Sequence, residues 1–504
     1  MIRLFIAGVV SAAICLAQQT ISVGNAAGVS GGVAPGSILS IRQLKPPQII
    51  GPVDPSRVSV RVRPSGSVGS LDAPLLPSNL LSIWAQLPAS TPLGPADVTL
   101  TIDGQASAPA PIMVTRTNFG LFTQAGNGLG AAIAQNQDAT VNKLTNPALP
   151  GQYVTLWGTG LGSATPDEVT VQLGGTAIAP EYVGHAPALP SVDQINFRIP
   201  DSGTLDGCYV SVIVRTGEIM SNEATISKAS RFGPCEHPFG LSAADMATLD
   251  SGGTILFGTV HLESDVGTVP GFSSEPARVE LALADFLPRG AFEIGLSAQP
   301  LTADDSYFGC RTSQSDLLGV VRFGSDIDAG DALTLTGPGQ TASLSRGVGI
   351  YQMSGSPFVE PLTDQPFFGP GIWRIEGPGG QAIGHFKADF MLPPLVHWTN
   401  RDSLTTMNRG QDQDVTWDPT GYIDTDVATV SLGQILCKAP ATTGKLTIPS
   451  SLLETLPLGS ASLRLGIAPR PNRRTLFSLP LTDGSAAQAF FDYSFSETIS
   501  SQFN

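Results

Sequence analysis

The first residue that could do chemistry is a serine in a glycine-rich stretch. Residues 28–32 read GVSGG, which matches the GxSxG pattern of serine nucleophiles, with Ser30 at its centre. In enzymes with this pattern a buried strand precedes the serine, a helix follows it, and Asp and His partners come later. Here the pattern follows a short N-terminal stretch and leads into the Pro35-Gly36 turn. We therefore interpret Ser30 as a loop residue, and we predict no catalytic set around it.

One histidine is spaced to begin a metal site. His261 and Glu263 lie two residues apart in a predicted strand, so both side chains project from one face. A metal ion needs further ligands, and the sequence offers none close by. We therefore expect an exposed strand face there and no metal. The remaining histidines belong to no HExxH motif and are His185, His237, His385 and His397.

A loop with spaced aspartates is the best calcium candidate. Asp326, Asp328 and Asp331 flank a glycine, and calcium takes about six to eight oxygen ligands, which such a loop can supply. The Glu that completes a standard calcium loop is absent, and Asp with Gly also forms ordinary turns. The turn is the preferred interpretation and calcium is the alternative, with Asp424 and Asp426 as a weaker pair. We predict no cofactor.

Sugar chemistry is the other class that these side chains would serve. Glycoside hydrolysis needs two carboxyl groups about 5–10 Å apart, a separation that sequence does not give. The carboxylates available for it are Glu263, Glu280, Glu293 and Asp389. Tryptophans stack on sugars, yet in small sandwiches they more often fill the core, which suits the strand context of Trp84 and Trp417. The five tryptophans are Trp84, Trp157, Trp373, Trp398 and Trp417.

The segment that precedes all of these residues is apolar. Residues 1–17 have the layout of a secretory signal, in which Arg3 is the positive start, residues 4–15 are apolar, and cleavage falls before Gln18. The run is too short to span a bilayer, which takes about 20 residues. Lipidation of Cys15 is the alternative, disfavoured by its bulky neighbour. No later stretch is long enough to cross a membrane, so we predict a secreted or envelope protein without a transmembrane segment after cleavage.

Composition favours an all-β chain. Charged residues make up 14% of the 504 residues and hydrophobic ones 41%, with 56 Gly and 41 Pro. Short Val, Ile, Leu and Thr runs between these turn formers predict many short strands. The formal net charge of −15 repels phosphate backbones, so we expect no nucleic-acid partner. A chain of this length divides into several domains.

An internal repeat with a period of about 110–115 residues organises the first half. Each copy begins with a Pro-Gly turn and an alternating strand, at residues 34–41 and 149–156. Alternation turns every second side chain inward, which predicts two tandem immunoglobulin-like antiparallel β-sandwiches at 18–115 and 116–230. We expect the joining segment, 119–146, to pack against both modules.

Several motifs follow one another in this region. They are Asn25-Ala26-Ala27, residues 33–37 (VAPGS), 119–122 (FGLF), Asn146-Pro147-Ala148, 158–162 (GTGLG), 193–200 (DQINFRIP) and Met220-Ser221-Asn222. With them, the stretch from about Asn25 to Ser227 resembles the Solibacter-type C-terminal domain, a family of uncharacterised secreted proteins of acidobacteria. The resemblance implies export, a β-sandwich fold and no assigned activity. That domain commonly closes its proteins, and the first copy departs from it with Arg42-Gln43-Leu44 where a glycine-rich turn is expected.

Beyond the repeat the composition changes, and two further β regions are predicted at 231–397 and 398–504. Turns at 328–331 and 377–380 favour antiparallel hairpins. One short helix is predicted at 243–249. The predicted strands are 253–262, 278–283, 292–296, 318–323, 332–335, 372–376, 384–390, 427–432, 445–449 and 462–467.

The four cysteines that follow the signal form no CxxC pair, and their spacing does not suit zinc. An even number in an exported chain indicates disulfides, with three possible connectivities. Cys208 begins the last predicted strand of the second module and Cys235 follows that module, so we favour this pair, worth about 3–4 kcal/mol in the chain-entropy model. The pair Cys310–Cys437 follows by elimination.

Together these observations predict a secreted or envelope-associated, non-enzymatic protein. Its sandwich modules would act as structural, adhesion or binding surfaces for an extracellular or cell-surface ligand, either polysaccharide or protein. The alternative is a carbohydrate-binding or carbohydrate-active protein with its site in residues 235–397.

Overall fold

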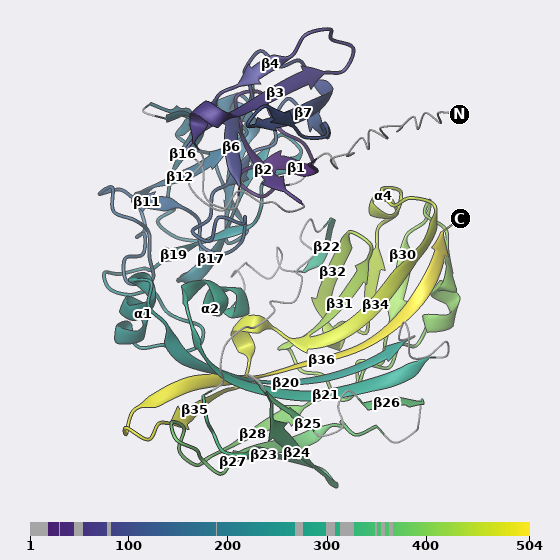
Figure 1. The fold of residues 1–504 in the computed structure, drawn as a ribbon. Coiled ribbons are helices and arrows are strands. Elements are labelled where there is room, and N and C mark those ends of the chain that lie inside the picture. Colours follow the sequence, from purple (N-terminus) through teal and green to yellow (C-terminus); the bar gives the residue numbers. More distant parts are fainter. Residues whose placement is uncertain are drawn as a thin grey trace, which may run out of the picture.

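The computed structural model describes residues 19–29, 31–44, 54–77, 82–187, 189–267, 276–298, 308–312, 327–347, 350–353, 358–361 and 366–503. The predicted signal, Ser30, Asp326 and the predicted strand at 318–323 lie outside these ranges. Three units follow one another from the top of Figure 1 to its lower half. They are module 1 (19–114), module 2 (116–229) and a C-terminal unit (231–503).

Module 1 is a sandwich of two antiparallel sheets. Burial alternates along its strands, most regularly in Val58–Pro64, where every second residue is buried. The first sheet has the order β1-β2-β6-β5 and the second β4-β3-β7-β8, with β9 beside β7. The elements are β1 (Ile21–Asn25), β2 (Ile38–Gln43), η1 (Pro55–Arg57), β3 (Val58–Pro64), β4 (Leu71–Ala73), β5 (Leu75–Leu76), β6 (Ile83–Gln86), β7 (Gly94–Ile102), β8 (Gln105–Ala106) and β9 (Ala110–Val114).

Module 2 repeats this arrangement and adds one short strand, β11, to the first sheet. Its sheets have the orders β10-β12-β16-β15, with β11 beside β12, and β14-β13-β17-β18, with β19 beside β17. The predicted tandem antiparallel sandwiches are thereby confirmed, although two short strands follow β17, which was predicted to be the last. The elements are β10 (Gly120–Leu121), β11 (Ala134–Asn136), β12 (Tyr153–Thr159), η2 (Pro166–Glu168), β13 (Val169–Leu173), β14 (Thr176–Ile178), β15 (Tyr182–Ala186), β16 (Leu189–Arg198), β17 (Gly207–Thr216), β18 (Ile219–Met220) and β19 (Ala224–Lys228).

The C-terminal unit is built on one 15-stranded sheet. Its main path is β22-β32-β31-β34-β36-β20-β21-β25-β24-β23-β27-β28, with β26 beside β21 and both β29 and β35 beside β36, while β30 and β33 form a separate pair. The strands are β20 (Ile255–Gly267), β21 (Ala277–Arg289), β22 (Gly309–Thr312), β23 (Ala332–Gly337), β24 (Gln340–Arg346), β25 (Tyr351–Met353), β26 (Phe358–Pro361), β27 (Gly371–Gly377), β28 (Phe386–Leu392), β29 (Thr406–Met407), β30 (Gln413–Thr416), β31 (Asp426–Leu432), β32 (Ile435–Pro440), β33 (Lys445–Ile448), β34 (Gly459–Pro469), β35 (Leu476–Pro480) and β36 (Ala486–Phe503).

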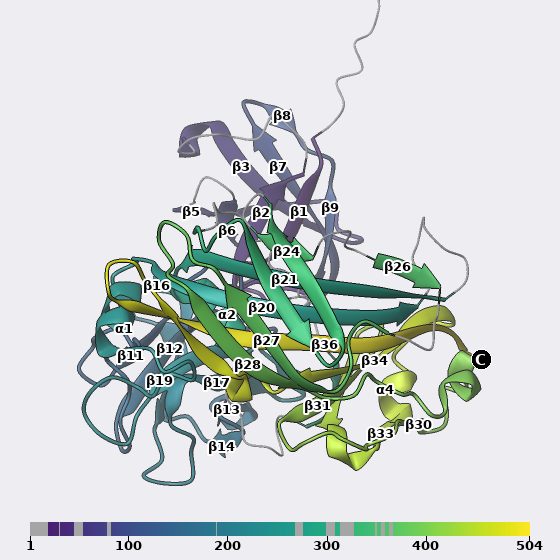
Figure 2. The ribbon, with the colours of Figure 1, turned by 90° about the horizontal axis from the view of Figure 1, so that it is seen from below.

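Strand β36 lies in the middle of this sheet. It is 18 residues long, pairs in parallel with β20, and pairs antiparallel with β34. Figure 2 shows β20, β21 and β36 running side by side across the molecule. One hydrophobic core extends from Val260 to Phe503. The structure therefore differs from the predicted division between residues 397 and 398, because β36 joins strands from both segments into one sheet.

Helices are few and short. The predicted helix at 243–249 is present as α1 (Ala243–Asp250), and the Ser242 side chain accepts a hydrogen bond from the Asp245 N–H at its start. The strand predicted at 292–296 is wrong, because this stretch lies in α2 (Ala291–Ala298), which buries Ile294 and Ala298 at helical spacing. The remaining short helices are η3 (Arg401–Thr405), η4 (Ala441–Thr443), α4 (Ser450–Leu453) and η5 (Pro471–Arg473).

Both favoured disulfide bonds are present. Cys208 in β17 is bonded to Cys235, and a small apolar core around them joins module 2 to α1 and α2. Cys310 in β22 is bonded to Cys437 in β32. The first bond thus cross-links module 2 to the C-terminal unit, and the second closes one end of the large sheet.

No helix in the described ranges is both long enough and apolar enough to span a bilayer.

Candidate functional site

The glycine motif at 158–162 lies against residues 116–120, which link the two modules. We call residues 116–120 the connector. Added Cβ atoms on Gly158, Gly160 and Gly162 would collide with the carbonyl oxygens of residues 120, 118 and 116, respectively. Backbone therefore lies directly against backbone, which only glycine at every second position permits. We call these three glycines the glycine track. Its role is structural, since it lets residues 116–120 lie flat on the end of β12.

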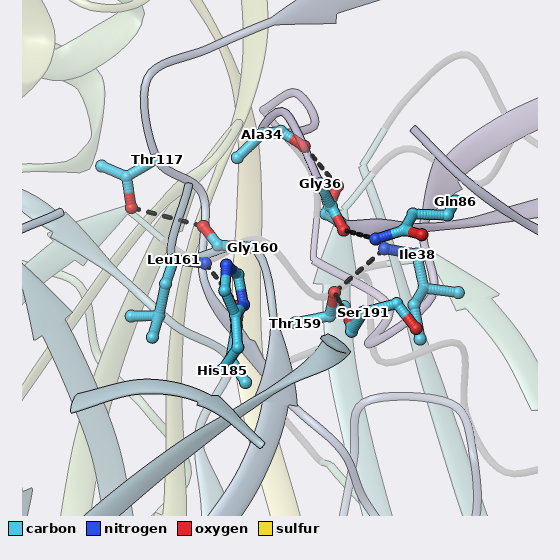
Figure 3. Close-up of polar contacts among 12 residues, drawn as sticks. Ala34, Gly36, Ile38, Gln86, Thr117, Thr159, Gly160, Leu161, His185 and Ser191 are labelled. Atoms are coloured by element: carbon cyan, nitrogen blue, oxygen red, sulfur yellow. Dashed lines mark hydrogen bonds and ion pairs between the residues drawn. The ribbon is translucent and has the colours of Figure 1, made fainter. Parts of the chain in front are cut away.

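A buried amide of module 1 is tied to the same connector. Asn25 is 3% exposed, and its Nδ2 donates to the carbonyl oxygen of Asn118 at 2.9 Å. The Thr159 hydroxyl accepts from the Ile38 N–H at 2.9 Å and donates to the Ser191 carbonyl at 3.2 Å (Figure 3). Each bond links the two modules or two strands in the region where the modules meet. We call this region, which includes the connector and the glycine track, the joint. The predicted packing of the joining segment, 119–146, against both modules is confirmed, because Gly120 lies directly against Ala27 of module 1 and the Ala132 N–H donates to the Thr225 carbonyl of module 2 at 2.8 Å.

A buried carboxylate, Asp193, hydrogen-bonds the backbone within the glycine track. Asp193 Oδ2 accepts from the Leu161 N–H at 2.7 Å, and its Oδ1 lies 2.8 Å from Nδ1 of His185. Figure 3 shows His185 beside Leu161. Burial raises the pKa of Asp193, although these partners oppose the rise. An Asp–His pair is one part of a catalytic triad, but no hydroxyl or thiol within the described ranges hydrogen-bonds the His185 ring. Asp193 thus connects the glycine track, through the Leu161 N–H, with His185.

The outward side of the first sheet of module 2 carries aromatic and amide side chains. Tyr153 and Trp157 lie on β12 and Tyr182 lies on β15, while β16 between them contributes Gln194 and Asn196. Tyr153 and Tyr182 are 40% and 39% exposed. We call this surface the tyrosine face. Its residues are Ile133, Gln135, Tyr153, Thr155, Trp157, Tyr182, Gly184, Gln194, Asn196 and Arg198.

Polar contacts fix the aromatic side chains of this face. The Tyr182 hydroxyl donates to the His185 carbonyl at 2.8 Å, and a Cβ atom on Gly184 would lie 3.0 Å from that hydroxyl oxygen. The tyrosine side chain therefore lies over the glycine. A hydrogen bond to Glu181 raises the pKa of Tyr153. The two tyrosines are thus held as exposed, oriented rings.

Of the tyrosine face, only Trp157 was named from the sequence as a possible sugar-binding residue. The available signal was the alternation of Tyr153, Thr155 and Trp157 on one side of the predicted strand, with Val154 and Leu156 on the other. Tyr182 lies two strands away in the sheet, a placement that depends on the sheet order.

The His261–Glu263 pair gains a third partner that the sequence did not suggest. Nε2 of His261 lies 4.0 Å from Glu263, and its Nδ1 lies 3.8 Å from Asp492 in β36. Arg474 donates to Asp492 at 3.0 Å. Burial alone would raise the pKa of Asp492, but Arg474 and His261 outweigh it and lower that pKa to about 2. Within the described ranges, no three His, Cys, Asp or Glu side chains are grouped to hold a metal ion.

The described part of the calcium candidate behaves as a turn. Asp328 Oδ1 accepts from the Gly330 N–H at 2.9 Å and lies 3.1 Å from an Arg346 nitrogen. The Gly330 N–H is the main cause that lowers the pKa of Asp328. Asp331 is exposed. Calcium binding stays the untested alternative to the preferred turn, because Asp326 lies outside the described residues.

The other candidate carboxylates are engaged in separate structural contacts. Glu280 is buried and accepts from the N–H groups of Phe367 and Phe368 at 2.7 and 2.9 Å. Glu293 accepts from the Gly290 N–H at 3.0 Å at the start of α2. Asp389 accepts from Arg374 at 2.5 and 2.8 Å on the β27–β28 pair. Each carboxylate is thus held by its own local donors.

Most tryptophans belong to the core. Trp373, Trp398 and Trp417 are buried, whereas Trp84 and Trp157 are half-buried on the outer faces of modules 1 and 2. The core prediction is confirmed for Trp417 and only partly for Trp84. The histidines divide similarly, since His237 is buried beside Tyr209, whereas His185 and His385 are exposed next to carboxylates.

Comparison with known proteins adds little beyond the fold. No protein-family model and no curated protein match the chain. Among solved structures it is similar to SGBP-B of the Bacteroides ovatus mixed-linkage glucan utilization locus, in complex with a mixed-linkage heptasaccharide (13% identity, 39% of this chain and 43% of that one, TM-score 0.20). It is also similar to domains 5–6 of the S-layer protein SbsC (12%, 42% and 98%, 0.20) and to a tetra-tandem repeat from the extending region of a large adhesion protein (13%, 95% and 99%, 0.14). The chain spans less than half the length of the first of these.

Proposed function

We propose that this chain is an exported, non-enzymatic protein whose sandwich modules form a stiff scaffold that presents a binding surface. The observation that carries the proposal is the Cys208–Cys235 bond, which cross-links module 2 to the C-terminal unit. Disulfides persist in oxidising compartments and are rare in the cytosol. An oxidising compartment outside the cytosol therefore suits this structure, and the chain reaches such a compartment by export.

The joint between the modules supports a structural role. Asn25 and Thr159 make buried hydrogen bonds across it, and the glycine track leaves no room for water between the connector and β12. Bending the joint would break these bonds and leave buried polar groups unpaired, at a cost of about 1–3 kcal/mol each. The two modules thus favour one fixed orientation.

The resemblance to the Solibacter-type secreted domain is part of this proposal. The motif residues that suggested it are concentrated at the joint, where Asn25, the glycine track and Asp193 are in contact with the connector or with one another. Asn222 also belongs here, since its side chain accepts from the Leu121 N–H at 2.8 Å and donates to the Gly128 carbonyl at 2.7 Å. The motifs therefore support a modular fold, and no chemistry is attached to them.

Export is tested by following the chain's first residues and its thiols. The full chain is expressed in a bacterial host, the cells are fractionated, and free thiols are labelled with a maleimide before mass spectrometry. We expect a protein that begins at Gln18, lies outside the cytoplasm and has no free thiol. A chain that retains residues 1–17, stays in the cytosol and carries labelled cysteines would overturn the proposal. Deletion of residues 4–15 is the matched control, since it should retain the chain inside the cell.

A second candidate function is carbohydrate-active chemistry in residues 235–397. The observation that favours it is the set of ionisable groups around His261, which includes Glu263 and, from β36, Asp492. Release of reducing ends from polysaccharides by the purified chain tests it. Activity that Glu263→Gln and Asp492→Asn both abolish would support this function. Activity that survives both substitutions, or no activity at all, would remove it.

A further inference from the structure

We propose that the tyrosine face of module 2 binds a neutral polysaccharide chain. The inference deepens the proposed function by naming the ligand class and the place where it binds. It rests on the proposed function in one respect: the protein must be exported to meet an extracellular polysaccharide.

The side chains of the tyrosine face match the two kinds of surface that a sugar ring offers. A pyranose ring has apolar C–H faces, against which an aromatic ring packs, and a rim of hydroxyl groups. Tyr153, Trp157 and Tyr182 supply the aromatic rings, and Gln194 and Asn196 supply amides that donate and accept hydrogen bonds. Gln194 Nε2 donates to Asn196 Oδ1 at 3.0 Å, which orients the two amides in the middle of the face.

The spacing of the aromatic side chains requires a ligand longer than one sugar. Tyr153 and Trp157 are four residues apart on β12, which places them about 13 Å apart along the strand. Tyr182 lies two strands away, about 10 Å across the sheet. A single ring does not reach all three positions. An extended chain of several sugars can contact two or more of them at once, and each further contact increases affinity.

The charges favour a neutral chain over an acidic one. Arg198 is the one ionised side chain among the ten residues of the tyrosine face, and it is bound to the Gly151 carbonyl at 3.0 Å and to Asp201 at 3.3 Å. Glu181, next to the face, holds Tyr153. The formal net charge of the whole chain is −15, which repels polyanions. An uncharged polysaccharide meets no such repulsion.

Module 1 provides a matched surface on which to test the assignment. By strand correspondence, β6 of module 1 takes the place of β16, and its outward residues are Trp84 and Gln86. On the neighbouring β5, Leu76 is paired with Trp84 and takes the place of the tyrosine on β15. Trp84 therefore lies on the same kind of sheet side without the amide pair. We expect the Trp84→Ala protein to bind as the wild type does.

The test is native affinity electrophoresis of the purified, disulfide-bonded chain in gels that contain a soluble polysaccharide. The probes are hydroxyethylcellulose, galactomannan and soluble starch as neutral chains, and alginate as an acidic one. The variants are Tyr153→Ala combined with Tyr182→Ala, Gln194→Glu alone, and Trp84→Ala as the control. Far-UV circular dichroism and thermal unfolding establish that each variant is folded. Because Gln194→Glu keeps the side-chain length and removes no ring, it tests the face even if the double variant misfolds.

We expect at least one neutral polysaccharide to retard the wild type and Trp84→Ala, with affinity about tenfold weaker for the tyrosine variant. Gln194→Glu should also weaken binding. The location is wrong if the folded tyrosine variant and Gln194→Glu are retarded as strongly as the wild type. The ligand class is wrong if no neutral chain retards the folded wild type, or if alginate alone does. Cell fractionation measures export, and affinity electrophoresis of the purified chain measures binding. A negative result in one experiment therefore does not change the result of the other.

Discussion

Apart from the added β11 of module 2, modules 1 and 2 share a strand order and have similar cores, yet their surfaces differ. Each has a first sheet packed on a second through alternating Val, Ile and Leu residues. The outward side of the first sheet carries Trp84, Gln86 and Leu76 in module 1, but tyrosines and an amide pair in module 2. The difference teaches that packing restricts the interior of a repeated module, while its solvent-facing side is free to acquire a separate role.

The same comparison explains where the glycine track occurs. In module 2 the connector lies across the end of β12, so every second residue from Gly158 to Gly162 must lack a side chain. In module 1 the corresponding strand, β2, is instead paired with β1 along Ile21–Asn25, as far as Gln43. The Arg42-Gln43-Leu44 stretch therefore needs no glycines. The departure noted in the sequence has this structural cause.

The largest effect should come from a glycine that only module 2 needs. Gly160→Ala places a methyl group against the Asn118 carbonyl at a φ of +109°, and we expect it to destabilise module 2 by more than about 3 kcal/mol. The control is Gly36→Ala in module 1, where φ is +84° but no atom lies within 4 Å. That change should cost only about 1–2 kcal/mol of backbone strain. Hydrogen exchange of peptides from each module measures both, and equal effects would contradict the glycine track.

The second largest effect is expected from removal of the Cys208–Cys235 disulfide bond, because module 1 has no such cross-link. Replacing Cys208 and Cys235 by serine should lower the free energy of unfolding of module 2 by about 3 kcal/mol and leave module 1 unchanged. Serine at Cys310 and Cys437 is the comparison, since it should affect only the C-terminal sheet. Limited proteolysis followed by mass spectrometry reports which unit opens. Cleavage in module 1 in response to the first pair of changes would show that the units are not independent.

A smaller effect is expected at the buried amide of the joint. Asn25→Ala removes the donor to the Asn118 carbonyl and should cost about 2 kcal/mol, because that carbonyl loses a buried partner. Gln86→Ala is the matched control, since its amide donates to the Gly36 carbonyl at 3.1 Å within module 1 and is only partly buried. We expect less than about 1 kcal/mol there. Urea unfolding measures both changes, and a greater loss for Gln86→Ala would contradict the importance of the joint.

The smallest effect is a pH dependence at the connector. Arg116 donates to Glu168 at 2.7 Å, and this bond, with those from Thr165, lowers the pKa of Glu168 from 4.5 to about 2. The ionised carboxylate is thus favoured in the folded state, so its contribution is full above pH 4.5 and is lost as the pH falls towards 2. Thermal unfolding of Glu168→Gln should vary less over this range than that of the wild type. Identical profiles would show that the ion pair contributes nothing.

Alternation and turn residues were enough to predict the sandwiches, because a repeated pattern appears twice and each copy supports the other. The disulfide Cys208–Cys235 was predictable for a similar reason, since both cysteines flank one module boundary. The pattern failed at 292–296, where apolar residues alternate as in a strand but Ile294 and Ala298 also have helical spacing. A local pattern does not decide between these two.

Contacts between distant segments were not predictable. Asp492 reaches His261 only because β36 pairs in parallel with β20, and nothing in either segment specifies that partner. The strand itself had a signal, since Phe491, Tyr493 and Phe495 alternate with polar residues. The tyrosine face was missed for the same reason, because it is assembled from four strands whose order is a property of the folded sheet.

The central place of β36 also dictates the order in which the molecule is completed. Modules 1 and 2 each close with strands that are near in sequence, so a chain emerging from its N-terminal side can finish them early. The C-terminal unit must wait until β36 has emerged, because one edge of β20 pairs with residues 488–497 of that strand. Until that moment a long strand edge stays open to pairing with other chains, so during vectorial delivery this unit is the one that needs protection by chaperones.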